Sequence, residues 1–309
     1  MKLSIVIPVY GCREALNELY ERIVSSLEKM ECDFEIVLVN DACPQNSWEI
    51  IAHLCKQDSR VIGIEMSRNF GQMKAILAGL DHASGEWIVV MDCDLQDSPE
   101  DIHRLYEKAM EGYDVVFSRR KNRKDSRETI LLSNVFYKIY KYATDGNYDR
   151  ALSNFSIVHS AVIKNYCAMR EQHRAYVMYL RWLGFKQAVI EVEHNERYSG
   201  SSSYTFKKRY EMALGILTSQ SDKILRLFVG LGFIVSLIAF FSIIGMVIFK
   251  FTANVAVGWT SLIATNVLIG GILMMVMGIV GIYVGNIFMQ TKGRPLYVVR
   301  QIVNDKKEE

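Results

Sequence analysis

The stretch VVMDCDLQDSPE, residues 89–100, joins an apolar run to a group of acids and one amide. Five polar side chains lie within nine residues after that run: Asp92, Asp94, Gln96, Asp97 and Glu100. Carboxylates this close repel one another, and a bound cation relieves the repulsion. Asp97 and Glu100 also suit the first turn of a following helix. Asp92 and Asp94 precede that helix, so the stretch predicts a buried strand that ends at a divalent metal site.

The alternation of apolar strand and helix recurs through the first 118 residues. Nearly continuous apolar runs, which suit strands buried on both faces of a parallel sheet, occupy residues 3–9, 34–40, 61–66, 86–91 and 114–118. Helical stretches lie between them, near residues 13–30, 46–57, 71–83 and 99–112. This order predicts an α/β fold, with a mostly parallel Rossmann-like sheet and helices on both faces. Ligands of such sheets gather at the carboxyl ends of the strands, where Asp41, Arg68 and the acidic group are expected.

The pattern loosens after residue 118. The run RRKNRKDSR, residues 119–127, holds six basic residues in nine. A helix is expected near 126–144, a strand at 155–159, helices within 160–183 and a strand at 187–194. The segment 205–227 is amphipathic and predicts a juxtamembrane helix.

Two long uncharged runs follow, at residues 228–249 and 262–288. Each exceeds the ~20 helical residues that cross a bilayer core of ~30 Å. Basic residues flank the pair on both outer sides: Lys223, Arg226, Lys292, Arg294 and Arg300. The positive-inside bias therefore places both termini in the cytoplasm. We expect a catalytic domain at 1–204, two transmembrane helices within 228–289 and a cytoplasmic tail at 290–309.

The composition limits the class of ligand. The chain has 36 basic and 34 acidic residues, for a net charge of +2, so no global charge favours nucleic acid. None of the six cysteines forms a CxxC pair, which predicts reduced thiols and neither a zinc site nor a disulfide framework. Walker A and GxGxxG loops are absent from the sequence, so a phosphate ligand would need a metal and arginines. Arg68 and Arg197 are candidates, together with the basic run at 119–127.

Four motifs in register carry a resemblance: IVIPVYG (5–11), VNDACPQNS (39–47), RNFGQMKAILAGL (68–80) and DCDLQDSPE (92–100). They resemble family 2 glycosyltransferases with the GT-A fold. Three later motifs, ERYSGSSSYTF (196–206), SDKILRL (221–227) and KGRPLYVV (292–299), narrow the resemblance to the polyprenyl-phosphate glycosyltransferases. That group includes dolichol-phosphate mannose synthase and the bactoprenol glucosyltransferases. The resemblance covers nearly the whole chain.

The resemblance implies roles for the matching positions. The positions that match the nucleotide site are Pro8, Tyr10, Glu14 and Asp41. The positions that match the metal and diphosphate site are Asp92, Asp94 and Gln96. Two arginines of the acceptor loop, Arg119 and Arg127, match residues that meet the lipid phosphate. Arg197 and Ser201 match a segment that closes over the diphosphate.

Two positions depart from the family pattern. Gly11 stands where relatives usually have Asn, in VYGC instead of VYNE. Asn154 stands in SNFS where relatives often have an Asp that is a proposed catalytic base. An amide cannot accept a proton at neutral pH, which calls a general-base step into question. On turn preferences alone, Asn154 is equally well read as a turn residue before the strand at 155.

The implied activity is an inverting transfer of one sugar from a nucleotide diphosphate sugar to polyprenyl (undecaprenyl) phosphate. Family habit favours a UDP-sugar as the donor, and a guanine nucleotide stays open. It would use Mg²⁺ or Mn²⁺ at the cytoplasmic face of a bacterial inner membrane, for cell-envelope glycan. The expected partners are the donor, the lipid acceptor and the bilayer, and the sequence is compatible with a homo-oligomer.

Two alternative functions agree less well with the sequence. A processive polysaccharide synthase carries Gln-x-x-Arg-Trp, but Met178 takes the Gln position before Arg181 and Trp182. A non-catalytic membrane scaffold predicts a degraded metal site, whereas Asp92 and Asp94 are both present.

Overall fold

The computed structural model describes residues 2–120, 152–172, 174–193 and 258–304, with short helical stretches between 225 and 245. The chain divides into two units. The first unit comprises residues 1–131, 148–205 and 294–309, and the second comprises 132–147 and 206–293. The predicted helix at 126–144, the segment 205–227 except for residue 225, and half of the apolar run at 228–249 lie outside the described residues.

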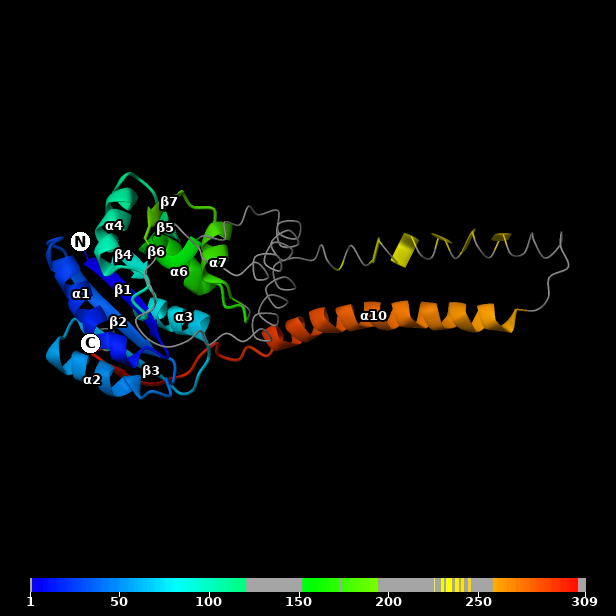
Figure 1. Cartoon of the computed structure of the whole chain (residues 1–309), viewed down its shortest axis with the longest axis horizontal. Helices are drawn as coiled ribbons and strands as arrows, with labels where there is room; N and C mark the ends of the chain where they lie inside the picture. Colours follow the sequence, from blue (N-terminus) through cyan, green and yellow to red (C-terminus); the bar gives the residue numbers. More distant parts are fainter. Residues whose placement is uncertain are drawn as a thin grey trace. The chain divides into compact units, whose positions relative to one another are not determined.

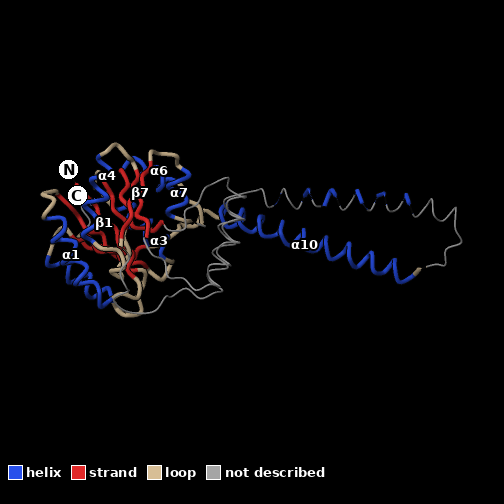
Figure 2. Tube along the Cα trace, turned by 45° about the horizontal axis from the view of Figure 1, so that its top comes forward, coloured by secondary structure: helices blue, strands red, loops and turns tan. Residues whose placement is uncertain are grey.

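The first unit is built on an eight-stranded sheet in the order β7-β5-β6-β4-β1-β2-β3-β8 (Figures 1 and 2). The strands are β1 (Lys2–Val9), β2 (Asp33–Asn40), β3 (Val61–Met66), β4 (Trp87–Val90), β5 (Val115–Arg120), β6 (Leu152–His159), β7 (Gln187–Val192) and β8 (Val299–Val303). Only β6 and β8 run antiparallel to their neighbours. The other six strands share one direction, so the prediction of a mostly parallel sheet is confirmed within a mixed sheet.

Helices cover both faces of this sheet (Figure 1). They are α1 (Leu16–Glu28), α2 (Ser47–Gln57), α3 (Gln72–His82), α4 (Ile102–Met110), α6 (Ser160–Ala168) and α7 (Tyr176–Trp182). Short 3-10 turns, η1 (Arg13–Ala15) and η2 (Pro99–Asp101), lead into α1 and α4. Helix α1 contacts α2 and α4 on one face, and α6 contacts α3 and α7 on the other. The expected α/β architecture, with helices on both faces, is therefore present.

The sheet is buried because its strands carry the apolar runs of the sequence. Seven of the eight residues of β1 are buried, and β2 has the same pattern. Helix α3 approaches β1 so closely that a Cβ on Gly79 would lie 2.4 Å from Cγ1 of Val6. Glycine is thus required where α3 crosses the sheet, and this close packing fixes the position of α3.

A buried carboxylate, that of Glu35, links three segments at the amino-terminal end of the sheet. Glu35 accepts hydrogen bonds from the Ser4 hydroxyl at 2.6 Å and from the Ser84 backbone N–H at 2.7 Å, and it pairs with Lys2. Burial acts to raise the pKa of Glu35, but the bonds from Lys2, Ser4 and Ser84 outweigh it and hold the pKa below its ordinary value. Glu35 is therefore ionised in the folded protein at neutral pH.

The segment after residue 293 returns to the first unit, which the sequence analysis did not anticipate. Strand β8 pairs antiparallel with β3 and forms one edge of the sheet. Tyr297 donates a hydrogen bond to Asp81 at 2.6 Å, and the Asn304 amide donates to the backbone carbonyls of Cys55 and Val61. The backbone N–H of Ser67 donates to the carbonyl of Val298 at 2.9 Å. The predicted tail thus contains a structural strand.

The second unit contains the long helix α10 (Trp259–Thr291). The most apolar 18 residues within 268–291 have a mean hydropathy of 2.3, and none of the side chains described in that window is buried. These 24 residues are long enough to cross a bilayer. The structure thus provides one helix that could span a membrane, in agreement with the predicted span at 262–288; the described residues do not test the span at 228–249.

Candidate active site

Three polar residues of the loop after β4 are partly accessible to solvent. Asp92, Asp94 and Gln96 are half-buried, whereas Cys93 and Leu95 between them are 6% and 4% exposed. Leu95 adopts a left-handed backbone with φ of +58°, which keeps its side chain in the core while the chain turns. The three predicted metal ligands, Asp92, Asp94 and Gln96, are therefore all partly exposed to solvent at the carboxyl end of β4.

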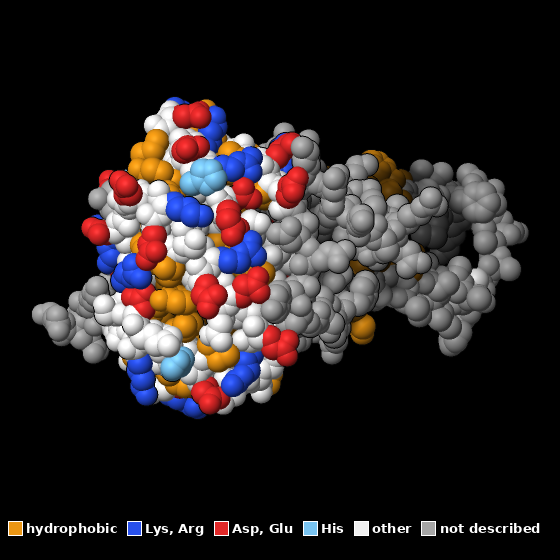
Figure 3. All heavy atoms as spheres, turned by 60° about the vertical axis from the view of Figure 1, so that its left-hand side comes forward, with side chains coloured by type: hydrophobic (Ala, Val, Ile, Leu, Met, Phe, Trp, Pro, Cys, Tyr) orange, Lys and Arg blue, Asp and Glu red, His pale blue; other side chains and the backbone are white. Residues whose placement is uncertain are grey.

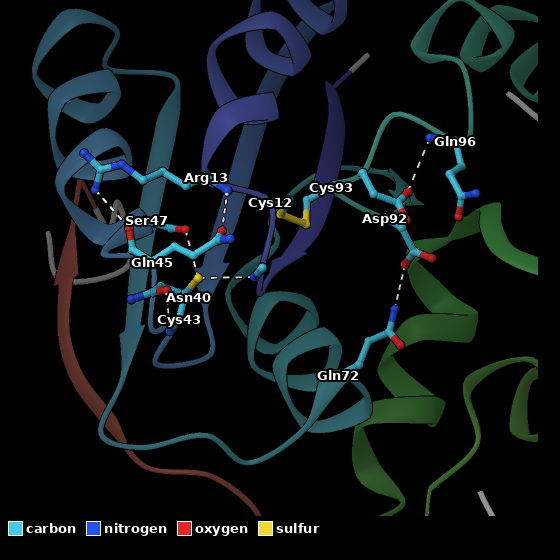
Figure 4. Close-up of a disulfide and its surroundings, with 12 residues drawn as sticks. Cys12, Arg13, Asn40, Cys43, Gln45, Ser47, Gln72, Asp92, Cys93 and Gln96 are labelled. Atoms are coloured by element: carbon cyan, nitrogen blue, oxygen red, sulfur yellow. Dashed lines mark hydrogen bonds between the residues drawn. A yellow bond between two sulfur atoms is a disulfide. The ribbon is translucent and has the colours of Figure 1, made fainter. Parts of the chain in front are cut away.

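Two hydrogen bonds orient the carboxylates of this loop. The Gln72 amide nitrogen donates to Oδ1 of Asp92 at 2.7 Å, and the backbone N–H of Gln96 donates to Oδ1 of Asp94 at 3.3 Å. Figure 4 shows Gln72 reaching from the start of α3 toward Asp92. Asp92 and Asp94 thus keep defined orientations although they repel each other.

Asp41 holds the loop that leads into α3. It is 2% exposed, and its two carboxylate oxygens accept backbone N–H bonds from Phe70 at 2.7 Å and Gly71 at 2.8 Å. Burial raises the pKa of Asp41, against the lowering effect of these bonds. Gly71 has φ of +95°, which glycine adopts without strain. Asp41 therefore fixes the backbone of the loop before α3 from a buried position.

Cys12 and Cys93 form a disulfide between the loops after β1 and β4, with their Cα atoms 6.2 Å apart (Figure 4). The expectation of reduced thiols at these two positions is thus wrong. The physical reason is the sheet register: Val6 pairs with Val90, so the ends of β1 and β4 lie side by side although 81 residues separate the cysteines. Cys32, Cys43, Cys55 and Cys167 are free thiols, as expected.

The loops after the first two strands are also joined. The Gly11 N–H donates to Sγ of Cys43 at 3.2 Å, and Arg13 donates to the backbone carbonyls of Gln45 and Asn46. Four successive links therefore connect the loops after β1, β2, β3 and β4 and return to β1 through the disulfide. We call this set of contacts the loop ring. It limits independent movement of the segments that carry the predicted ligands.

The donor set fits a hard divalent cation. Among the described residues no group of three or more His, Cys, Asp or Glu side chains could hold a metal without help. Mg²⁺ and similar ions commonly take one or two carboxylates and complete their shell with substrate phosphates and water. Asp92 and Asp94, with the amide of Gln96, match that requirement and would hold the ion only together with a phosphate ligand.

The sequence profile described as "Glycosyl transferase family 2" matches residues 4–167, which contain most of β1, all of β2 to β6 and the whole loop ring. The chain belongs to this family. The match covers more than half of the 309 residues and includes the acidic loop after β4.

Relatives along the full length are also glycosyltransferases. The "Prophage bactoprenol glucosyl transferase homolog" of Escherichia coli is 32% identical over 98% of this chain and 99% of the relative. The "Undecaprenyl-phosphate 4-deoxy-4-formamido-L-arabinose transferase" of Proteus mirabilis is 32% identical over 99% of this chain and 95% of the relative. Among solved structures, glucosyl-3-phosphoglycerate synthase from Mycobacterium tuberculosis, in complex with Mn²⁺, UDP and phosphoglyceric acid, superposes with a TM-score of 0.51. It is 14% identical over 70% of this chain and 76% of that one, so it supports the GT-A fold alone.

The remaining donor-site predictions of this family 2 glycosyltransferase fall in different environments. Pro8 is buried within β1, whereas Tyr10 is 42% exposed just after it. Glu14 is exposed in η1. Arg68 is exposed, with its guanidinium 4.1 Å above the Phe70 ring. All four lie at or near the carboxyl ends of β1 and β3, as was predicted for Arg68, and their roles toward a nucleotide stay predictions.

The acceptor-side predictions centre on β5 and β6. Arg119 is half-buried in β5 and pairs in register with Leu152 of β6. Asn154 lies within β6, half-buried, so its interpretation as a turn residue is wrong. The strand begins at Leu152, earlier than the apolar pattern suggests, because Leu152 pairs with Arg119 of β5. The adjacent Ser118 and Ser153 hydroxyls share a hydrogen bond of 2.6 Å. Arg127, Arg197 and Ser201 lie outside the described residues.

A cavity of about 810 Å³ lies elsewhere, between α1 and the η2–α4 segment. Its lining includes the ion pair of Arg22 with Glu100, and it contains none of the predicted ligands. Figure 3 shows the side of the molecule that lies at the left of Figure 1, with acidic and basic side chains interspersed. A surface on which both signs of charge alternate does not favour a charged ligand such as a nucleotide, so this face is not our candidate active site.

Gln72 and the disulfide are the parts of the site that the sequence analysis missed. Gln72 stands in the RNFGQ stretch that carried the resemblance, but nothing in the sequence pairs it with Asp92. The signal that could have found both is the order of parallel strands, which brings the ends of β1, β2, β3 and β4 to one edge.

Proposed function

We propose that this family 2 glycosyltransferase transfers one sugar from a nucleotide diphosphate sugar to polyprenyl phosphate, with inversion at the anomeric carbon. The observation that carries the proposal is the pair Asp92 and Asp94, oriented at the carboxyl end of β4 in a chain whose full-length relatives are named for bactoprenol and undecaprenyl phosphate. UDP-sugar is the donor we favour.

The donor would bind along the loop ring. Tyr10 offers an exposed aromatic ring for the base, and the exposed Arg68 offers positive charge for phosphate oxygens. Asp92, Asp94 and Gln96 would hold Mg²⁺ or Mn²⁺, which stabilises negative charge on the departing diphosphate when it is bound. The links of the loop ring hold these side chains in place before the donor arrives, which lowers the cost of organising the site.

The acceptor would be a phosphate monoester, whose second pKa is about 6. Near pH 7 most of it is a dianion and needs no base to remove a proton, so an amide at Asn154 is compatible with catalysis. Arg119, on β5, and Arg127, in the basic run that follows, are our candidates for holding the acceptor phosphate. Both arginines keep their charge at any physiological pH.

We place the reaction at the cytoplasmic face of the bacterial inner membrane. The apolar stretch 268–291 of α10 supports membrane attachment, and the flanking basic residues support cytoplasmic termini. A membrane-attached site gains a high local concentration of a lipid acceptor. The product would serve the synthesis or modification of cell-envelope glycan.

The test uses the full chain in membranes supplied with undecaprenyl phosphate and a panel of radiolabelled nucleotide sugars, including UDP-glucose and GDP-mannose. We expect label from one donor to enter the organic phase as a mild-acid-labile lipid. The matched control is Asp92→Asn, which retains size and loses one charge. Release of free sugar without labelled lipid, in wild type but not in the control, would mean that the acceptor is wrong while the enzyme class is right.

A further inference from the structure

We propose that Gln72 is a positioning residue that fixes the carboxylate of Asp92 for metal binding. This inference rests on the proposed function, because it takes Asp92 as a ligand of the metal. Neither the predicted ligand set nor the resemblance assigns Gln72 a role. The contact that carries the inference is the hydrogen bond from the Gln72 amide to Oδ1 of Asp92 at 2.7 Å.

Gln72 is the first residue of α3, and the backbone on its amino-terminal side is fixed. Gly71 donates its N–H to Asp41 at 2.8 Å, and its carbonyl accepts N–H bonds from Lys74 and Ala75 at 3.0 and 3.1 Å. These contacts join the residue before Gln72 to Asp41 and to the first turn of α3.

The backbone on the carboxyl-terminal side is fixed as well. Helix α3 buries an uninterrupted run of residues, 75–80, and it packs against the sheet and against α6. At Gly79 the helix lies so close to β1 that even an added Cβ would overlap Val6, so α3 packs tightly on the sheet at this point. The Gln72 side chain therefore projects toward Asp92 from a rigid support, and it is itself half-buried.

The chemistry of the side chain matters because the donor is neutral. An amide N–H orients a carboxylate without cancelling its charge, so Asp92 keeps its attraction for a cation. A lysine at this position would compete with the metal, and a glutamate would repel Asp92. Partners that orient a metal ligand through a hydrogen bond typically contribute 10- to 100-fold in metal affinity.

The experiment measures Mn²⁺ binding without turnover. Purified full-length protein is titrated with Mn²⁺ in the presence of UDP, and separately of GDP, and free Mn²⁺ is read by electron paramagnetic resonance. Gln72→Met keeps the length of the side chain and removes the amide. The matched control is Gln57→Met, the same change at the exposed last residue of α2.

We expect Gln72→Met to weaken Mn²⁺ binding by about 10- to 100-fold. Gln57→Met should bind as the wild type does, and the melting temperatures of both variants should stay close to that of the wild type. Gln72→Glu should bind Mn²⁺ more weakly than the wild type as well, because a second acid then faces Asp92.

Asp92→Asn separates this inference from the proposed function. If Asp92→Asn weakens Mn²⁺ binding and Gln72→Met does not, Gln72 has no positioning role and the metal site stands. If the wild type binds no Mn²⁺ with either nucleotide, or if Asp92→Asn leaves binding unchanged, the metal site and the inference are both wrong. A loss of binding in Gln72→Met that comes with a large fall in melting temperature would assign Gln72 a structural role and overturn the inference.

Discussion

Reduction of the Cys12–Cys93 disulfide should destabilise the first unit measurably. The bond links residues separated by 81 positions. In the chain-entropy model, a cross-link of that span restricts the unfolded chain by about 4.5 kcal/mol. Measured contributions are commonly smaller, so we expect about 2–4 kcal/mol. For a domain of this size, each kcal/mol moves the melting temperature by about 2–4 °C, and the expected fall is roughly 5–15 °C.

The assay is thermal unfolding of the purified full-length protein in detergent, with and without dithiothreitol, after the thiols have been counted by maleimide labelling under denaturing, non-reducing conditions. Four of the six cysteines should react without reductant and all six with it. Cys12→Ser should melt at the temperature of the reduced wild type and should no longer respond to dithiothreitol. Cys32→Ser removes a free, half-buried thiol and is the control, because it should retain the response.

Two results would refute this reasoning. Six reactive thiols in protein purified without reductant would mean that the bond does not form in the cell or during isolation, as is usual for cytosolic proteins. An unchanged melting temperature after complete reduction would mean that native contacts of the loop ring, and not the cross-link, hold the loops after β1 and β4 together.

Four further changes test other parts of the protein. Asp94→Asn should slow sugar transfer by ~10²-fold or more, and near-normal transfer would contradict the metal site. Glu35→Gln should lower the free energy of unfolding by about 2 kcal/mol at pH 7. Because the pKa of Glu35 is lowered in the folded protein, this difference in stability should keep its full size above the ordinary pKa near ~4.3 and vanish as the pH falls through the folded pKa. A pH-independent difference in denaturant titrations would exclude the charge of Glu35 as its cause. Asn154→Asp should change the transfer rate at pH 7 by less than about tenfold, since the acceptor is already a dianion, and a gain of orders of magnitude in the pH–rate profile would show that a base is needed. Cysteine introduced at Asn254 should react with an impermeant maleimide on intact cells, whereas labelling from outside at Arg300→Cys would reverse the proposed topology.

The strands of the first unit could be predicted from the sequence because burial on both faces leaves continuous apolar runs. The predicted 61–66 is β3 as observed, and the other predicted strands that precede residue 120 match within about two residues at each end, the usual uncertainty of such boundaries. Strand β8 was missed because VRQIV has polar residues in its middle and is half-exposed at a sheet edge. An edge strand lacks the burial on both faces that makes the inner strands recognisable.

The sequence allowed us to predict which residues form the site, but not which of them are in contact with one another. Asp92 and Asp94 were found because acids are unusual directly after a buried strand. Asp41 was expected to line the nucleotide, and the structure shows both of its carboxylate oxygens bonded to the loop before α3. Contacts such as that of Gln72 depend on strand order and register, which arise from tertiary packing and leave no local pattern in the sequence.

Strand β8 also sets an order of events during synthesis. The outer edge of β3 is complete at residue 66, but its partner lies at residues 299–303 and leaves the ribosome only after α10. At about 5–20 residues per second, that delay is roughly 10–50 s. Throughout it, β3 presents unpaired backbone groups that can recruit another chain. A nascent chain stalled within α10 would therefore be prone to aggregation. The hydrogen bond from the Ser67 N–H to the Val298 carbonyl, just after β3, can likewise form only once the hydrophobic helix has been translated.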